Sequence, residues 1–208
     1  MGLDLKVERK LKKQGYRFII GLDEAGRGPL AGPVIAAAVV MNSKFKIQNS
    51  EIKDSKKLSP KKREELYQAL KSCSQIQWGR GLVSARVIEK INILEATKMA
   101  MRRAVKNLER KSDRKFSKKE TILIIDGNQR INSKFLEMPI VKADATIFLC
   151  ACASILAKVE RDNLMRKYHK IYPQYNFRQH KGYPTKEHYK KIKKYGLSPL
   201  HRKTFRCY

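Results

Sequence analysis

Hydrophobic and polar residues follow two different periods along this chain, and each period predicts one kind of secondary structure. Apolar runs of strand length occupy residues 16–25, 33–41, 74–84 and 121–126. The first two runs are joined by GRGPLAGP, a connection rich in glycine and proline that predicts a turn and therefore a β-hairpin. The run 121–126 is apolar almost throughout, as a strand buried on both faces would be. A short fifth strand is predicted over 139–145.

Helical spacing of apolar residues appears in the segments between and after these runs. Ser59 is the predicted N-cap of one helix, with Pro60 at its first position. Longer helices are predicted over 93–111 and 153–172, and a short one over 184–196 that stops at Gly196. A hairpin followed by strands that alternate with helices predicts a mixed sheet in an α/β domain.

Charge adds a prediction about partners. The 208 residues include 47 Lys and Arg against 19 Asp and Glu, a formal net charge of +28 that is spread along the chain. A folded body with such a positive field favours nucleic acid as its partner. No apolar run approaches the roughly 18 to 20 residues of a membrane-spanning helix, and no signal peptide is recognisable, so we expect a cytoplasmic protein.

Cysteine and histidine do not change this picture. The four cysteines form no Cys-x-x-Cys pair and, without a secretion signal, are expected to be reduced thiols: Cys73, Cys150, Cys152 and Cys207. The four histidines all lie in the last forty residues, with a spacing that matches no common zinc pattern: His169, His180, His188 and His201.

Four carboxylates carry the candidate chemistry. Asp23 and Glu24 stand where the first strand is expected to end, and Asp126 closes the buried strand 121–126. Asp144 follows among small residues in VKADA. Carboxylates that meet at strand ends repel one another unless a proton or a cation lies between them, and hard oxygen ligands select Mg²⁺ or Mn²⁺. An acidic metal centre in a basic protein suits phosphodiester chemistry.

Simpler interpretations exist for some of these acids. Asp126 followed by Gly127 is also typical of a plain turn after a strand. Asp162 lies four residues after Lys158 on a predicted helix, so an intrahelical ion pair competes with a role in the site. Asp23 and Glu24 directly before a glycine-rich loop have no comparably simple interpretation.

The glycine-rich loop fits neither common nucleotide-binding pattern. It lacks the Gly-Lys-Ser/Thr of a phosphate-binding loop, and its glycines are spaced Gly-x-Gly-x-x-x-Gly rather than as in the dinucleotide fingerprint. A plain tight turn is one interpretation of these glycines. Arg27 between Gly26 and Gly28 also suits a loop that a nucleic acid backbone can approach closely.

Together the motifs are specific enough to name a family. From about residue 16 to residue 205, the chain resembles bacterial ribonuclease HII in the order and spacing of GLDEAGRGPLAGPV, DSKKLS, ATKMAMRRAV, IIDGN, KADA, ASILAKVERD, HKGYPTKEHY and GLSPLHRKTF.

The resemblance implies a ribonuclease H-like fold, with a mixed five-stranded sheet flanked by helices. It implies a catalytic domain over 1–172 and a small helical C-terminal part over 173–208 that contacts substrate. The activity implied is an endonuclease that cuts the RNA strand of RNA/DNA hybrids and nicks duplex DNA 5′ of an embedded ribonucleotide. The family's catalytic and metal-binding tetrad falls on four residues: Asp23, Glu24, Asp126 and Asp144.

The resemblance also places substrate contacts. Gly26, Arg27 and Gly28 fall on the loop that contacts the 2′-hydroxyl, and Tyr183 falls on the tyrosine that packs against the junction sugar. An anchor for the C-terminal helix is the alternative role for Tyr183. Lys56, Lys57 and Lys181 are candidate phosphate ligands, for which a solvated basic face is the alternative.

The expected mechanism is in-line attack of water on the phosphate, assisted by two metal ions, giving 5′-phosphate and 3′-hydroxyl ends. Expected partners are RNA/DNA hybrid and ribonucleotide-containing duplex DNA, bound by a monomer, with a sliding clamp left open. A non-catalytic basic RNA-binding protein would explain the charge but not the four acids. A DNA transposase or resolvase of the same fold is the second alternative, and it would not require a 2′-hydroxyl.

Overall fold

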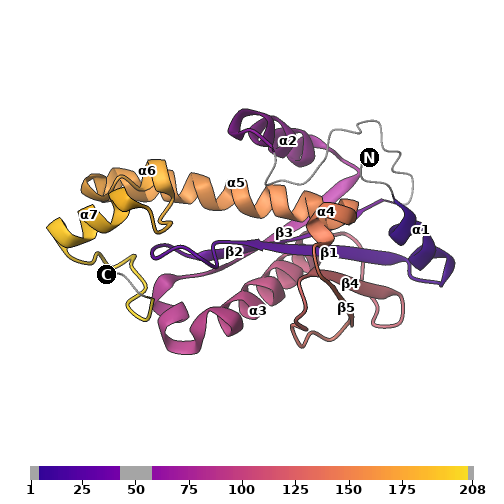
Figure 1. Ribbon diagram of the computed structural model, residues 1–208. Coiled ribbons are helices and arrows are strands. Elements are labelled where there is room, and N and C mark those ends of the chain that lie inside the picture. The colour runs from indigo at the N-terminus through magenta and orange to yellow at the C-terminus, as the bar shows by residue number, and fades with distance from the viewer. Residues whose placement is uncertain (1–4, 43–57, 206–208) are drawn as a thin grey trace.

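The computed structural model describes residues 5–42 and 58–205, which form a five-stranded sheet with helices on both faces (Figure 1). The strand order is β3-β2-β1-β4-β5. The hairpin pair β1 and β2 is antiparallel, as is β2 with β3, whereas β1, β4 and β5 run parallel. The predicted mixed sheet and hairpin are therefore confirmed. The strands are β1 Phe18–Ala25, β2 Val34–Met41, β3 Ile76–Val83, β4 Thr121–Asp126 and β5 Leu136–Ile140.

The helices form two layers and a C-terminal extension. Helices α2 and α5 lie over one face of the sheet and α3 over the other, while α6 and α7 lie beyond the C-terminal end of α5 (Figure 1). The helices are α1 Lys6–Lys13, α2 Pro60–Ser72, α3 Ala85–Lys111, α4 Ala143–Thr146, α5 Phe148–Ile171, the 3₁₀ turn η1 Pro173–Tyr175, α6 Phe177–His180 and α7 Lys186–Tyr195.

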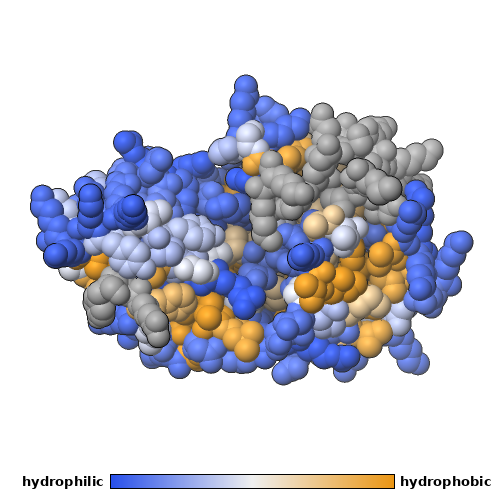
Figure 2. Space-filling model, in the orientation of Figure 1, coloured by the Kyte–Doolittle hydropathy of each residue, from blue (hydrophilic) through white to orange (hydrophobic). Residues whose placement is uncertain are grey.

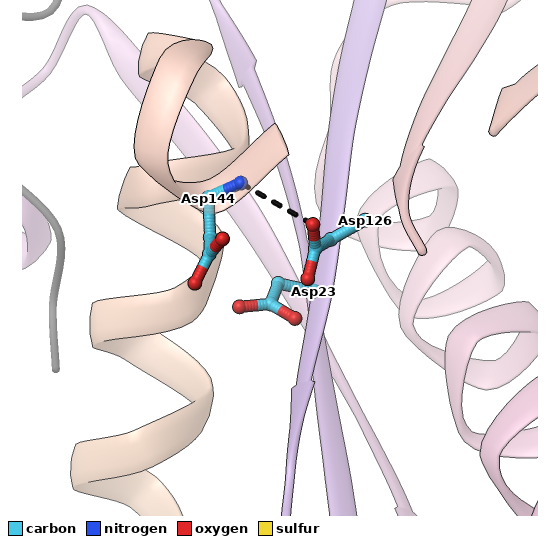
Figure 3. A group of neighbouring side chains, drawn as sticks. All are labelled: Asp23, Asp126 and Asp144. Carbon is cyan, nitrogen blue, oxygen red and sulfur yellow. Dashed lines mark hydrogen bonds between the residues drawn. The ribbon is translucent and has the colours of Figure 1, made fainter. Parts of the chain in front are cut away.

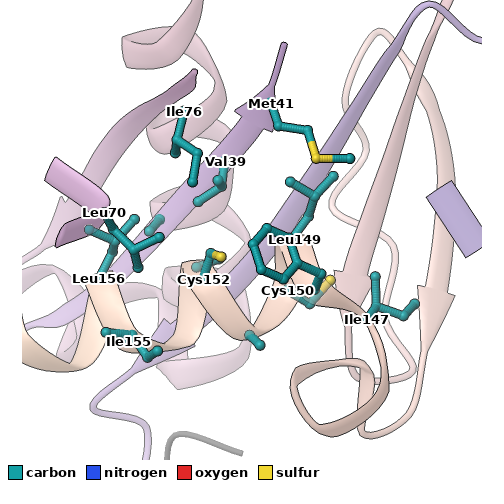
Figure 4. Packing of buried hydrophobic residues seen from close by; sticks show 14 of the residues in the cluster. Val39, Met41, Leu70, Ile76, Ile147, Leu149, Cys150, Cys152, Ile155 and Leu156 are labelled. Atoms are coloured by element: carbon teal, nitrogen blue, oxygen red, sulfur yellow. The ribbon is translucent and has the colours of Figure 1, made fainter. Parts of the chain in front are cut away.

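The sheet is buried on both faces because its central strands carry few polar side chains. Every residue of β2 is buried, and its alternating side chains divide between the two layers. On the α5 face, Val39 and Met41 pack with Leu149 and Cys152 of the helix and with Leu70 of α2 (Figure 4). The described cysteines Cys73, Cys150 and Cys152 are free thiols, as expected, whereas Cys207 lies outside the described residues.

Two glycines let α3 pack directly onto the edge strand β3. A Cβ at Gly81 would lie 1.8 Å from the carbonyl oxygen of Ala100, and one at Gly79 would lie 2.3 Å from that of Ala104. A side chain at either position would therefore push the helix off the sheet.

Several helix ends follow the predicted caps. The Ser59 hydroxyl accepts a hydrogen bond from the Lys62 N–H at 3.2 Å, and Pro60 opens α2. Helix α7 ends at Tyr195, directly before Gly196, whose φ is +71°. The predicted helix over 93–111 is the second part of α3, which begins at Ala85 and kinks at Asn92. The Asn92 side chain caps that second part by accepting from the N–H groups of residues 94 and 95.

Three expectations about element boundaries were wrong. The fifth strand spans Leu136–Ile140 rather than 139–145, because Lys142 adopts a left-handed conformation (φ +60°) that ends the extended chain. The following residues form α4, so Asp144 lies on a helix and not on a strand. Helix α5 begins at Phe148, five residues before the predicted start, in a stretch buried all round where apolar spacing gives no helical signal.

Helix α1 was not predicted, and one of its side chains caps the N-terminus of α5. Glu8 of α1 is fully buried, and its Oε1 accepts a hydrogen bond from the Leu149 N–H, 3.2 Å away, in the first turn of α5. A carboxylate at this position also complements the positive end of the helix dipole.

No helix within the described ranges is long and apolar enough to cross a membrane. On the face shown in Figure 2, hydrophilic side chains cover most of the surface over α2 and the C-terminal helices.

Candidate active site

The parallel register of β1 and β4 brings the first two aspartates together. Leu22 aligns with Ile125, so the next residues in each strand, Asp23 and Asp126, are neighbours at the carboxyl ends of adjacent strands. Residues aligned in this way point to the same face of a sheet. The buried Ile and Leu residues before them anchor both strands in the apolar layers on the two faces of the sheet.

Asp144 reaches the same place from helix α4. Its backbone N–H donates to Asp126 Oδ1 at 3.4 Å, and Figure 3 shows the three carboxyl groups gathered between the strand ends and the helix. One carboxylate oxygen from each of Asp23, Asp126 and Asp144 lies within 4.8 Å of the others. Asp23 and Asp144 are only 4% and 3% exposed. Oxygen ligands at this spacing fit a divalent cation such as Mg²⁺ or Mn²⁺.

The cluster is electrostatically costly without a cation. Burial raises the pKa of Asp23 well above its ordinary value, and the negative charges of Glu24 and Asp126 raise it further. A hydrogen bond with the Ser154 side chain and one from the Glu24 N–H, 2.7 Å from Asp23 Oδ1, oppose this rise. A divalent cation would reverse the sign of the local field and favour the ionised carboxylates.

Glu24 lies beside the aspartate group but outside it. As the next residue of an extended strand it is directed differently from Asp23, and its carboxylate is not one of the three within 4.8 Å. It lines the same cleft, with Oε1 3.5 Å from Nη1 of the exposed Arg27. The structure thus brings together all four predicted acids, with Glu24 at the rim.

A cleft of about 260 Å³ opens over the acids. Sequence reasoning missed three polar residues of its wall: Arg63, Ser154 and Lys158. Ser154 and Lys158 lie four residues apart, on one face of α5, in the same motif that carried the resemblance. The four-residue spacing of Ser154 and Lys158 could therefore have identified them from the sequence. No feature of the sequence around Arg63 indicates that α2 lies near the strand ends. The cleft is lined by Asp23, Glu24, Ala25, Gly26, Arg27, Gly28, Arg63, Asp126, Ser154, Lys158 and Tyr183.

The glycine loop forms one wall of this cleft. Gly26 has φ +103°, and a Cβ there would lie 2.2 Å from Nε of Arg161, so only glycine fits. At Gly28 a Cβ would meet nothing within 4 Å, which leaves open space at an exposed position beside the acids. The loop is therefore tightly held on its inner side and accessible on its outer side.

Tyr183 also lines the cleft, and its backbone is held by a buried histidine cluster. Its side chain remains accessible, with the residue 38% exposed, and its carbonyl oxygen lies 2.9 Å from His188 Nδ1. His188 Nε2 in turn lies 3.0 Å from His201 Nε2, and the His180 ring stacks on His188 at 4.2 Å. Burial lowers the pKa of both His188 and His201 to about 4, so the cluster is neutral at physiological pH.

The remaining candidate residues lie elsewhere. Lys181 does not line the cleft: its Nζ contacts the carbonyl of Arg178, and burial lowers its pKa. Lys56 and Lys57 lie outside the described residues. Asp162 forms the intrahelical ion pair with Lys158, at 2.8 Å, that its spacing suggested.

The chain is similar to proteins of one family along nearly its whole length. Residues 20–207 match the family model Ribonuclease HII. Ribonuclease HII of Caldanaerobacter subterraneus is 48% identical over 95% of this chain and 78% of its own length. That of Clostridioides difficile is 47% identical over 92% of this chain and 71% of its own length. The crystal structure of ribonuclease H2 from Pyrococcus horikoshii superimposes with a TM-score of 0.69 at 26% identity, covering 91% of this chain and 94% of that one.

The raised pKa of Asp23 predicts that Asp23→Asn stabilises the metal-free protein. Folding must retain a proton on Asp23 or tolerate repulsion among buried charges, so stability falls as pH rises from the ordinary aspartate pKa towards the raised one. A neutral amide avoids this penalty. In EDTA at neutral pH we expect Tm to rise by about 2 to 4 °C, which corresponds to roughly 1 kcal/mol at this chain length.

The exposed Asp113 supplies a matched control, because Asp113→Asn removes one negative charge outside the cluster. Thermal melts at pH 4 and pH 8 should show that the gain from Asp23→Asn grows with pH, while the control changes little at either pH. An Asp23→Asn protein that melts below the wild type in EDTA at pH 8 would contradict this electrostatic account.

Proposed function

We propose that this chain, which belongs to the ribonuclease HII family, cuts RNA/DNA hybrids and also nicks duplex DNA on the 5′ side of a single embedded ribonucleotide. It has the ribonuclease H-like fold and is an endonuclease of the hydrolase class. The observation that carries the finer proposal is the arrangement of one cleft. Asp23 and Asp126 line that cleft with the glycine loop and Tyr183. Asp144 brings a third carboxylate oxygen within 4.8 Å of theirs.

The residues present fit a divalent cation. Asp23, Asp126 and Asp144 would hold it, with Glu24 completing a tetrad at the rim of the cleft. Mg²⁺ or Mn²⁺ bound there would activate water for in-line attack and stabilise the leaving 3′-oxygen. The chain's own contribution is to hold the acids in place through the β1–β4 register and to keep them largely out of bulk solvent. The products would carry 5′-phosphate and 3′-hydroxyl ends.

Cationic residues of the wall suit the scissile phosphate and its neighbours. Lys158 and Arg63 line the cleft with the acids and offset part of their negative potential. Farther out, the small C-terminal part that we assign to residues 173–208 presents a strongly basic helix. The five lysines of α7 are Lys186, Lys190, Lys191, Lys193 and Lys194. Such a surface holds a duplex through its phosphates. Lys56, Lys57 and Lys181 are proposed as further phosphate ligands outside the cleft.

Recognition of RNA is assigned to the glycine loop and Tyr183, which line the cleft with the acids. RNA differs from DNA at the 2′-hydroxyl, so a group of the protein must contact it. Of Gly26, Arg27 and Gly28, the last two are exposed, and no side chain at Gly28 blocks its backbone. Tyr183 lines the same cleft, and its partly exposed ring would pack on the sugar. A DNA transposase or resolvase of the same fold would need neither contact.

The first test is cleavage of duplex DNA that carries one ribonucleotide, with and without Mg²⁺ or Mn²⁺. The unmodified chain should nick 5′ of the ribonucleotide only when the metal is present. Asp126→Asn should lower the rate by at least about a hundredfold, because it keeps the shape of a metal ligand but loses its charge. Its affinity for RNA/DNA hybrid should stay within about twofold, since phosphate contacts lie on other residues.

Electrophoresis of the products separates the candidate functions. Equal cutting of all-DNA duplex would favour the transposase or resolvase alternative, and binding without cutting would favour a non-catalytic RNA-binding protein. Turnover by Asp126→Asn near the wild-type rate would remove Asp126 from the site.

Tyr183→Ala tests sugar recognition. Loss of the ring contact should weaken activity on the single-ribonucleotide duplex by about tenfold or more, which corresponds to 1 to 3 kcal/mol on the scale of base–aromatic stacking. Activity on long hybrids, where many registers are available, should fall less. Because the side chain of Tyr183 is accessible, Tm should change little.

Tyr183→Phe is the matched control, since it keeps the ring and removes only the hydroxyl. Parallel loss of both activities in Tyr183→Ala, together with a Tm lower by several degrees, would make Tyr183 an anchor of the C-terminal part instead.

A further inference from the structure

Two arginines are fully buried beneath the glycine loop, which is unusual for a charged side chain. Arg161 comes from α5, and Arg202 comes from the C-terminal segment after α7. Both guanidinium groups donate to backbone carbonyl oxygens rather than reaching solvent. Burial of two such charges costs free energy. The charge-assisted hydrogen bonds to the carbonyls offset that cost, and they also hold the carbonyls in place.

The two arginines bind different parts of the loop. Arg161 donates to the carbonyls of Ala31, Pro33 and Lys181, each at 3.0 Å. Arg202 donates to the carbonyl of Gly26 at 2.6 Å and to that of Arg27 at 2.9 Å. It also donates twice to the carbonyl of Gly32, at 2.8 and 3.0 Å. Arg202 is therefore the side chain that holds the Gly26–Gly28 stretch itself.

The backbone around Arg202 is fixed to the same loop. The Arg202 N–H donates to the Leu30 carbonyl at 2.8 Å, and the Gly32 N–H donates to the Leu200 carbonyl at 2.8 Å. His201 forms an isolated β-bridge with Ala31. Burial and the charge of Arg161 lower the pKa of Arg202 to about 9, so the guanidinium stays protonated at neutral pH.

These bonds determine where the loop N–H groups point. A trans peptide unit is planar, so the carbonyl of one residue and the N–H of the next point in opposite directions. Because the carbonyls of Gly26 and Arg27 face Arg202, the N–H groups of Arg27 and Gly28 face away from it. Both residues are exposed and line the cleft, and within the described residues neither N–H donates to another group of the chain. Successive N–H groups on one side of a loop form a binding concavity for electronegative oxygen atoms.

We propose that Arg202 is a positioning residue for ribonucleotide recognition, which turns the N–H groups of Arg27 and Gly28 into the cleft as donors to oxygen atoms of the ribonucleotide. The inference rests on the proposed function and adds to it a residue distant in sequence from every motif acid. Arg202 touches no substrate in this account, because it acts through the loop.

The test compares the affinities of two duplexes that differ in one 2′-hydroxyl. All proteins carry Asp126→Asn so that substrate is not consumed, and fluorescence anisotropy in Mg²⁺ gives Kd for all-DNA duplex and for duplex with one ribonucleotide. The discrimination ratio is the first Kd divided by the second. Arg202→Lys keeps the charge but cannot hold both carbonyls in a fork, so the ratio should fall by about fivefold to tenfold. The all-DNA Kd should change by less than about twofold, because the phosphate contacts remain.

Leu108→Ala is the control for stability. Leu108 is fully buried on the α3 face of the sheet, away from the glycine loop, and its truncation lowers Tm without touching the cleft. Its discrimination ratio should equal that of the parent. The contrary result is a discrimination ratio that falls in step with Tm, and equally in Leu108→Ala and Arg202→Lys. In that case Arg202 is merely structural and the inference fails.

A second variant covers the case in which Arg202→Lys does not fold. Replacing Gly28 by glycolic acid exchanges its N–H for an ester oxygen and leaves Arg202 in place. This protein should show the same loss of discrimination with a nearly unchanged Tm. An unchanged ratio in the ester variant, or in a folded Arg202→Lys, would overturn the inference. No preference for the ribonucleotide in the Asp126→Asn parent would instead remove the proposed function, and this inference with it.

Discussion

Repulsion among buried carboxylates is the constraint around which this protein is organised. Asp23, Asp126 and Asp144 stay close because the β1–β4 register and helix α4 leave them no other position, and not because they attract one another. The stability needed to hold them comes from the apolar layers on both faces of the sheet. A divalent cation converts the same arrangement from a cost into a binding site.

The second organising interaction is the attachment of the C-terminal segment to the glycine loop. Arg161 and Arg202 bind loop carbonyls from beneath, while the histidine cluster holds the backbone of Tyr183. Hydrogen bonds thus connect the loop that follows Asp23 and Glu24 with the C-terminal segment that carries Tyr183, although these residues are separated by up to 160 positions in sequence. Such connections would support the proposed discrimination of a single hydroxyl, which depends on well-positioned groups.

How far the sequence predicts this arrangement depends on whether the signal is local. The hairpin and the Ser59 cap follow from local patterns, and the four acids followed from motifs. Helix α1 and the boundaries of β5 and α5 did not, because Glu8 acts on a helix 141 residues away and the buried run 147–152 has no polar face. Arg202 was also missed, since an arginine in a basic tail suggests a solvated surface until its carbonyl partners are known.

We propose that the three aspartates form one divalent-cation site between the strand ends and helix α4. Calorimetric titration of the metal-free protein with Mn²⁺, in buffers of different ionisation enthalpy, tests it directly. Binding should release protons below the raised pKa of Asp23, and it should be lost in a variant with Asp23, Asp126 and Asp144 all changed to asparagine. Equal Mn²⁺ affinity in that variant would contradict the account. So would Mn²⁺ binding that releases no protons at pH values below the raised pKa of Asp23.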